Sequence, residues 1–153
     1  MEHRIVASWA RGEAAFERGN YGKDHQVTFA GGQQIGASSA SSYGGNAALA
    51  DPEQLLLAAL ASCHMLTFLA IASNRGFVVE SYQDDAVCEL GQNPEGQTAV
   101  VRAVLTPKVR FSGDKHPDHE QFRQLHERAH KACFIANSVR TKVDLDPVMQ
   151  NDT

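Results

Sequence analysis

A helix running from Leu55 to Ala72 would be apolar on nearly every side, and this feature constrains the fold most. Only Ser62, His64 and Thr67 interrupt it. Surface helices have a polar face, so this one must be covered all round. A membrane span needs about 20 apolar residues, whereas this run is shorter, contains a histidine and has no charged anchor at its start. One small subunit has little with which to wrap a helix, so we expect its own sheet on one side and a second subunit on the other.

Both ends of this helix carry recognisable signals. Asp51 can cap it, Pro52 suits the first helical position, and Gln54 stands where a capping box needs it. The helix should run towards Ser73 and stop at residues 74–76, where Gly76 can adopt the left-handed conformation of a C-cap.

The remaining segments alternate between strands and one further helix. Arg4 to Phe29 is typical of a β-hairpin with a polar middle, and Gly31 to Ala50 of a short strand followed by a surface loop. β-Branched residues return from Phe77 to Leu90 and from Gln97 to Phe111, around a turn at Gly91 to Gly96.

Pro117 should open the second helix, whose apolar positions recur at helical spacing and end at Cys133. Alternation from Val139 to Leu145 then predicts a last strand. This order implies an α+β fold with a mostly antiparallel sheet, in a single domain spanning residues 1–153.

Composition excludes several classes of protein. The net charge is −4 and no basic run with interleaved aromatic residues occurs, so a nucleic-acid partner is not expected. A chain of this length folds without a metal or a disulfide, and we expect no cofactor. The N-terminus lacks the features of a signal peptide. The three cysteines, at positions 63, 88 and 133, form no CxxC pair, so we expect reduced thiols in the cytoplasm.

Cys63 and Cys133 both stand in apolar helices. Free cysteine commonly packs as a small hydrophobe, and for Cys88 we adopt that interpretation. For the other two, nearby polar residues (Ser62 and His64; Asn137 and Ser138) favour a site. Two thiols in an apolar pocket suit reduction of a lipophilic hydroperoxide, because one attacks the peroxide and the other resolves the sulfenic acid as a disulfide.

The attacking thiol must be a thiolate, yet burial raises the pKa of a cysteine. A thiolate at Cys63 would therefore need a cation nearby. His64 is adjacent in sequence and points elsewhere on the helix. The polar hairpin offers Arg11 and Arg18, and a carboxylate would be needed to hold either in place.

Three segments together resemble the OsmC/Ohr family of thiol-dependent peroxidases, and the resemblance covers nearly the whole chain. They are residues 51–56 (DPEQLL), 61–65 (ASCHM) and 132–139 (ACFIANSV). The first two resemble the start of the helix that carries the family's reactive cysteine. The third resembles the segment around its resolving cysteine. His64 and residues 21–25 are closer to the OsmC-like branch than to the Ohr branch.

The resemblance implies an intertwined homodimer in which antiparallel sheets wrap buried central helices. It implies that Cys63 attacks an organic hydroperoxide, that Cys133 resolves, and that Glu53 belongs to a carboxylate–arginine pair beside the thiolate. The reductant would be a dithiol, such as a protein-bound dihydrolipoyl group. The arginine loop of the Ohr branch has no residue-for-residue match here, and Arg18 is favoured slightly over Arg11.

Glu53 and Cys63 stand ten residues apart, or about 15 Å along a continuous helix. Either the helix breaks between them or Glu53 serves a site completed by the other subunit. Both options favour the dimer.

Other interpretations compete with the peroxidase. The same apolar interface pocket could bind a lipophilic small molecule without catalysis, or the helix could serve dimerisation alone. Residues 126–130 (HERAH) match the HExxH motif of zinc peptidases. However, no third ligand of the usual kind follows, because Cys133 and Ala136 occupy the positions of the longer motif. A partly exposed chance match is expected, with no metal.

Overall fold

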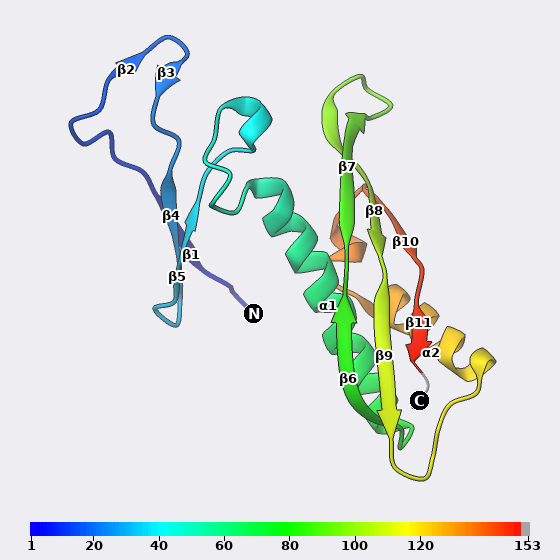
Figure 1. Cartoon of the computed structure of the whole chain (residues 1–153). Coiled ribbons are helices and arrows are strands. Elements are labelled where there is room, and N and C mark those ends of the chain that lie inside the picture. Colours follow the sequence, from blue (N-terminus) through cyan, green and yellow to red (C-terminus); the bar gives the residue numbers. More distant parts are fainter. Residues whose placement is uncertain (151–153) are drawn as a thin grey trace. The chain divides into compact units, whose positions relative to one another are not determined.

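The computed structural model describes residues 1–150, and the chain divides into two compact units between Leu55 and Leu56 (Figure 1). The expectation of a single domain over residues 1–153 stays a prediction.

The N-terminal unit is built on a three-stranded antiparallel sheet with the order β1-β4-β5. Its strands are β1 (Ile5–Ser8), β4 (His25–Phe29) and β5 (Gln34–Ala37). The polar middle forms a second small hairpin of β2 (Phe16–Glu17) and β3 (Asn20–Tyr21). A 3-10 helix, η1 (Ser41–Tyr43), lies in the loop after β5. The hairpin expected from Arg4 to Phe29 is confirmed.

The long helix α1 (Pro52–Asn74) has both predicted end signals. The Gln54 backbone N–H donates to Asp51 Oδ1 at 2.7 Å, and the Asp51 N–H donates to Gln54 Oε1 at 3.1 Å, which together form a capping box. Gly76 takes φ +74° and its N–H donates to the Ser73 carbonyl. The helix ends at Asn74, within the predicted stop at residues 74–76, and it is unbroken between Glu53 and Cys63.

The C-terminal unit contains two three-stranded sheets, with the strand orders β10-β8-β7 and β11-β9-β6. In Figure 1, β6 (Val78–Asp84) leads into β7 (Val87–Gln92), and the chain returns through β8 (Thr98–Leu105) and β9 (Pro107–Ser112). These pair antiparallel, β6 with β9 and β7 with β8. The expected strands from Phe77 to Leu90 and from Gln97 to Phe111 are each divided in two.

The last strand is shorter than predicted. It begins at Lys142 in β10 (Lys142–Leu145), and β11 (Val148–Gln150) follows. Both pair parallel to their neighbours, β10 to β8 and β11 to β9. Antiparallel pairs still predominate, so the α+β fold with a mostly antiparallel sheet is confirmed.

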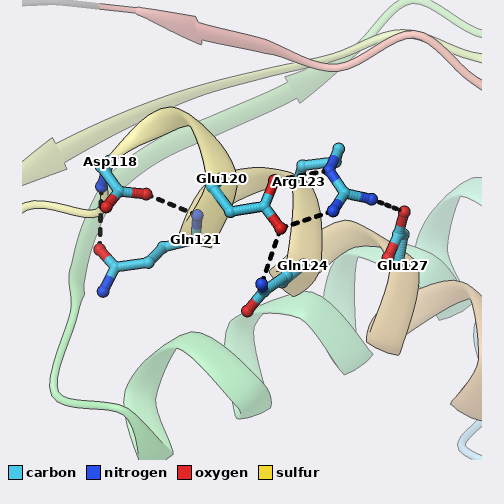
Figure 2. Close-up of polar contacts among 6 residues, drawn as sticks. All are labelled: Asp118, Glu120, Gln121, Arg123, Gln124 and Glu127. Carbon is cyan, nitrogen blue, oxygen red and sulfur yellow. Dashed lines mark hydrogen bonds and ion pairs between the residues drawn. The ribbon is translucent and has the colours of Figure 1, made fainter.

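The second helix, α2 (His119–Ala132), begins two residues later than Pro117. Asp118 is its N-cap and forms a capping box with Gln121 (Figure 2). An N-cap residue has extended rather than helical backbone angles, and so the helix cannot include Pro117. Cys133 is the C-cap, not an interior helical residue.

α1 and α2 pack on β9 through one apolar core. Phe68 and Ala72 of α1 meet Val109 and Phe111 of β9 and the buried face of α2. Buried residues of α1 recur at every fourth position: Leu60, His64, Phe68 and Ala72. Elsewhere the helix is more open, and Leu66 is 60% exposed. By length and composition alone α1 could cross a membrane, a test that core helices of soluble proteins also pass. Cover by a second subunit stays a prediction.

Candidate functional site

The side chains of Cys63 and Cys133 form a hydrogen bond with each other. Cys63 is half-buried on α1, and Cys133, directly after α2, is only 1% exposed. Because both helices pack in one core, the two thiols meet as the sequence led us to expect. Cys88, interpreted as a packing residue, lies half-buried in β7 opposite Ala103.

A tight turn after α2 brings backbone N–H groups to the sulfur atoms. The Ala136 N–H donates to Cys133 Sγ at 3.4 Å, and the N–H groups of Phe134 and Ile135 hydrogen-bond with Cys63. Side chains hold this turn closed. Asn137 Nδ2 donates to the Lys131 carbonyl at 3.1 Å, and Ser138 Oγ donates to the Phe134 carbonyl at 2.7 Å. The polar residues noted after Cys133 therefore shape the turn.

The pKa of Cys63 lies below its ordinary value. Burial raises this pKa, but the hydrogen bond from the Cys133 thiol lowers it. The N–H groups of Ile135 and Phe134 and the Thr67 hydroxyl lower it further. Hydrogen bonds to the charged form favour ionisation. Neutral hydrogen-bond donors therefore favour the thiolate form of Cys63.

The pKa of Cys133 is shifted in the opposite direction. Burial raises it, and the hydrogen bond with Cys63 raises it further, while the Ala136 N–H only partly offsets these effects. The two sulfurs are therefore unequal. Cys63 ionises first, and Cys133 keeps its proton and donates it in the hydrogen bond.

A cation beside Cys63 was expected from the sequence. Within residues 1–150, the groups that shift the pKa of Cys63 are all neutral. Arg11, Arg18 and Glu53 belong to the N-terminal unit, so their roles beside the thiolate stay predictions. Thr67 and the N–H groups of residues 134 and 135 were missed. The recurrence of polar residues at Cys63 and Thr67, one helical turn apart, could have indicated the first of them.

A buried histidine pair between α1 and α2 was also missed. His64 Nε2 and His126 Nδ1 lie 3.0 Å apart, the ring planes are within 8° of each other with centroids 5.3 Å apart, and each residue is 1% exposed. Burial lowers the pKa of His64 to about 4 and that of His126 to about 3. Nearby His130 also lowers the pKa of His64. Both rings of the pair are neutral at pH 7.

This arrangement corrects one prediction about residues 126–130. His126 is buried, not partly exposed, because it stands four residues after Phe122 on the apolar face of α2. Glu127 is exposed and pairs with Arg123, which also binds Glu120 (Figure 2). Among the described residues, no group of three His, Cys, Asp or Glu side chains is arranged to hold a metal ion.

The N-terminal unit contains a hollow of about 740 Å³. Its walls are largely aromatic, formed by Trp9, Phe16, Tyr21 and Tyr43. Lys23 lies over the Tyr21 ring, 4.9 Å from its centroid. The hollow has the size of a small-molecule site, and none of its lining residues is a cysteine.

Several solved structures resemble this chain in sequence or in fold. An OsmC-like protein of unknown function from Vibrio cholerae is 42% identical, with a TM-score of 0.94 over 97% of this chain and 99% of that one. An organic hydroperoxide resistance protein from Legionella pneumophila shares the fold at 18% identity, with a TM-score of 0.67 over 99% and 98%. An organic hydroperoxide resistance protein from Bacillus subtilis also shares the fold at 18% identity, with a TM-score of 0.62 over 98% of each chain. No curated protein matches the sequence.

The family described as OsmC-like protein matches residues 44–147, which include both α1 and the turn after α2. The matched segment contains Cys63, Thr67 and Cys133, whose contacts form the candidate site. On this match and the similarity to the Vibrio cholerae protein, the chain belongs to the OsmC family.

Proposed function

We propose that this protein is a thiol-dependent peroxidase that reduces organic hydroperoxides. The observation that carries the proposal is the unequal pair of hydrogen-bonded thiols, in which the pKa of Cys63 is lowered and that of Cys133 is raised. A thiolate is the nucleophile in this chemistry, and a protonated neighbour is ready to resolve the product. The names of the Legionella pneumophila and Bacillus subtilis proteins, called organic hydroperoxide resistance proteins, agree with this activity.

The reaction begins at Cys63. Its thiolate attacks the terminal oxygen of the hydroperoxide, so that an S–O bond forms as the O–O bond breaks, and the alkoxide takes up a proton and leaves as the alcohol. The Cys133 sulfur then attacks the Cys63 sulfenic acid. An S–S bond forms, and the hydroxyl group leaves with the Cys133 proton as water. A dithiol reductant, such as a protein-bound dihydrolipoyl group, would reduce the disulfide and itself be oxidised.

Apolar groups beside the cysteines favour a lipophilic peroxide. Leu66 stands three residues after Cys63 on α1 and is 60% exposed, and Phe134 follows Cys133 and is 81% exposed. The same surface suits a second subunit, and a homodimer in the cytoplasm is part of the proposal. Because α1 is unbroken, Glu53 would serve the Cys63 of the other subunit, together with an arginine that it would hold. Arg18 is favoured slightly over Arg11 for that role.

The test is peroxide consumption coupled to mapping of the cysteines by mass spectrometry. With cumene hydroperoxide we expect one equivalent to be consumed and a disulfide to form between Cys63 and Cys133. Cys63→Ser should abolish consumption, whereas the matched variant Cys88→Ser should retain it. Consumption by Cys63→Ser at the wild-type rate would refute the proposal.

A second candidate function is non-catalytic binding of a lipophilic small molecule. The aromatic hollow of the N-terminal unit favours it, because its rings and its one lysine suit an apolar ligand with a polar end. Loss of peroxide consumption would have no bearing on that candidate. It requires a ligand that binds to Cys63→Ser and to the wild type with equal affinity.

A further inference from the structure

The chemistry proposed above does not use the buried histidine pair, although its members belong to the two helices that position the cysteines. His64 follows Cys63 on α1. His126 stands seven residues before Cys133 on α2, which is about two helical turns. The 3.0 Å contact between the rings therefore joins the helix that carries Cys63 to the helix that ends at Cys133.

Filling the core with this histidine pair costs free energy that apolar side chains would not. His126 is stacked on Phe68, with ring centroids 4.3 Å apart, and meets Phe122 edge-on at 4.7 Å. Neither His64 Nδ1 nor His126 Nε2 has a hydrogen-bond partner among the described protein groups. Burying polar atoms in apolar surroundings costs free energy, and two apolar side chains of similar volume would avoid that cost. Stability alone therefore does not account for the pair.

A hydrogen bond is directional, whereas apolar contacts are not. The core around the pair is aromatic and aliphatic, and such contacts tolerate small shifts of one helix along the other. The two imidazoles are nearly parallel, with 8° between their planes, so a shift of α2 along α1 would separate Nε2 from Nδ1. Single buried polar residues fix the register of coiled coils in the same way.

We propose that His64 and His126 are positioning residues that fix the register in which the Cys133 sulfur reaches the Cys63 sulfur. The inference rests on the proposed function and concerns its second step. In that step the S–S bond forms as the S–O bond of the Cys63 sulfenic acid breaks, and water leaves with the Cys133 proton. A disulfide tolerates only a narrow range of Cα and Cβ separations, so a shifted helix slows closure.

Paired substitutions separate the hydrogen bond from the packing. His64→Leu/His126→Leu removes both polar groups together, so neither is left without its partner. His64→Gln/His126→Asn keeps them, because the glutamine amide reaches the position of Nε2 and the asparagine amide that of Nδ1. Leu125→Val is the matched control, since this residue is buried on α2 and its change loosens packing without altering the pair.

Each variant is treated with cumene hydroperoxide, and two rates are measured. Sulfenic acid at Cys63 is trapped with dimedone, and the disulfide is followed by alkylation and mass spectrometry. At a pH well above the pKa of Cys63, where ionisation no longer depends on the hydrogen bond from Cys133, we expect the leucine pair to form sulfenic acid at the wild-type rate. It should close the disulfide at least about tenfold more slowly. Its melting temperature should equal or exceed that of the wild type. The glutamine–asparagine pair should close near the wild-type rate.

The inference is overturned if the leucine pair closes the disulfide as fast as the wild type or no more slowly than Leu125→Val. It is also overturned if the glutamine–asparagine pair is as slow as the leucine pair. Should the leucine pair not fold, His64→Met/His126→Met replaces it under the same criteria. Should peroxide leave wild-type Cys63 unoxidised, the proposed function fails by itself. Diamide, which oxidises two thiols to a disulfide as it becomes a hydrazine, then measures the same closure.

Discussion

Acid should destabilise this protein through the buried histidine pair. In the folded state, burial lowers the pKa of His64 to about 4 and that of His126 to about 3, whereas both start from an ordinary value of 6.5. Below pH 6.5 the unfolded chain therefore binds protons that the folded chain does not. The free energy of unfolding falls as the pH is lowered. The loss ends only when the folded rings themselves protonate, near their lowered pKa values.

The magnitude follows from the size of the pKa shifts. A difference of one pKa unit corresponds to about 1.36 kcal/mol. Between pH 7 and pH 4, each ring accounts for a loss of about 3 kcal/mol. Protonation of one ring opposes protonation of the other in the folded state, so the two losses add, and we expect about 6 kcal/mol for the pair. Domains are typically stable by about 5 to 15 kcal/mol, so this loss is enough to unfold a protein at the lower end of that range.

Urea unfolding measured at a series of pH values provides the assay. The matched variant is His64→Gln/His126→Asn, whose amides do not titrate. Its free energy of unfolding should fall much less steeply between pH 6.5 and pH 4 than that of the wild type. His3→Gln, at an exposed position, should follow the wild type. Equal pH dependence in the wild type and the glutamine–asparagine pair would refute the reasoning.

Three further predictions concern the site and the helix ends. Cys133→Ala should raise the pKa of Cys63, because it removes the strongest of the hydrogen bonds that lower it; thiolate absorbance as a function of pH measures this, and an unchanged pKa would contradict it. Asp118→Ala removes the capping box of α2 and should cost about 1 kcal/mol in urea unfolding, against no change if the cap contributes nothing. Gly76→Ala places a side chain at φ +74° and should cost about 1 to 2 kcal/mol. The control Gly31→Ala, where φ is not positive and no atom lies within 4 Å, should be nearly neutral.

The parts of the fold that local chemistry specifies were predictable from the sequence. Asp51, Pro52 and Gln54 define the start of α1, and Gly76 defines its end, because capping depends on residues within one turn. The meeting of the two cysteines was also predictable, since each lies on or beside an apolar helix face that must be buried.

Contacts between distant segments were not predictable in the same way. The parallel pairing of β10 and β11 depends on where the chain returns after α2, and alternation of side chains does not reveal strand direction. Backbone N–H groups carry no sequence signal, so their effect on Cys63 could not be read from residue types. His126 did carry one, because its position four residues after Phe122 places it on the apolar face of α2.

The turn after α2 also has a consequence for the balance between the oxidised and reduced forms of the protein. Hydrogen bonds from Phe134, Ile135 and Cys133 stabilise the sulfur of Cys63 when it is reduced and charged. In the disulfide Cys133 has no S–H to donate, and a neutral disulfide sulfur accepts hydrogen bonds from the two N–H groups only weakly, so the oxidised form is stabilised much less. Selective stabilisation of the reduced form makes a disulfide more oxidising. A Cys63–Cys133 disulfide would therefore transfer its oxidising equivalents readily to a dithiol, and the geometry that activates the thiolate would also promote its regeneration.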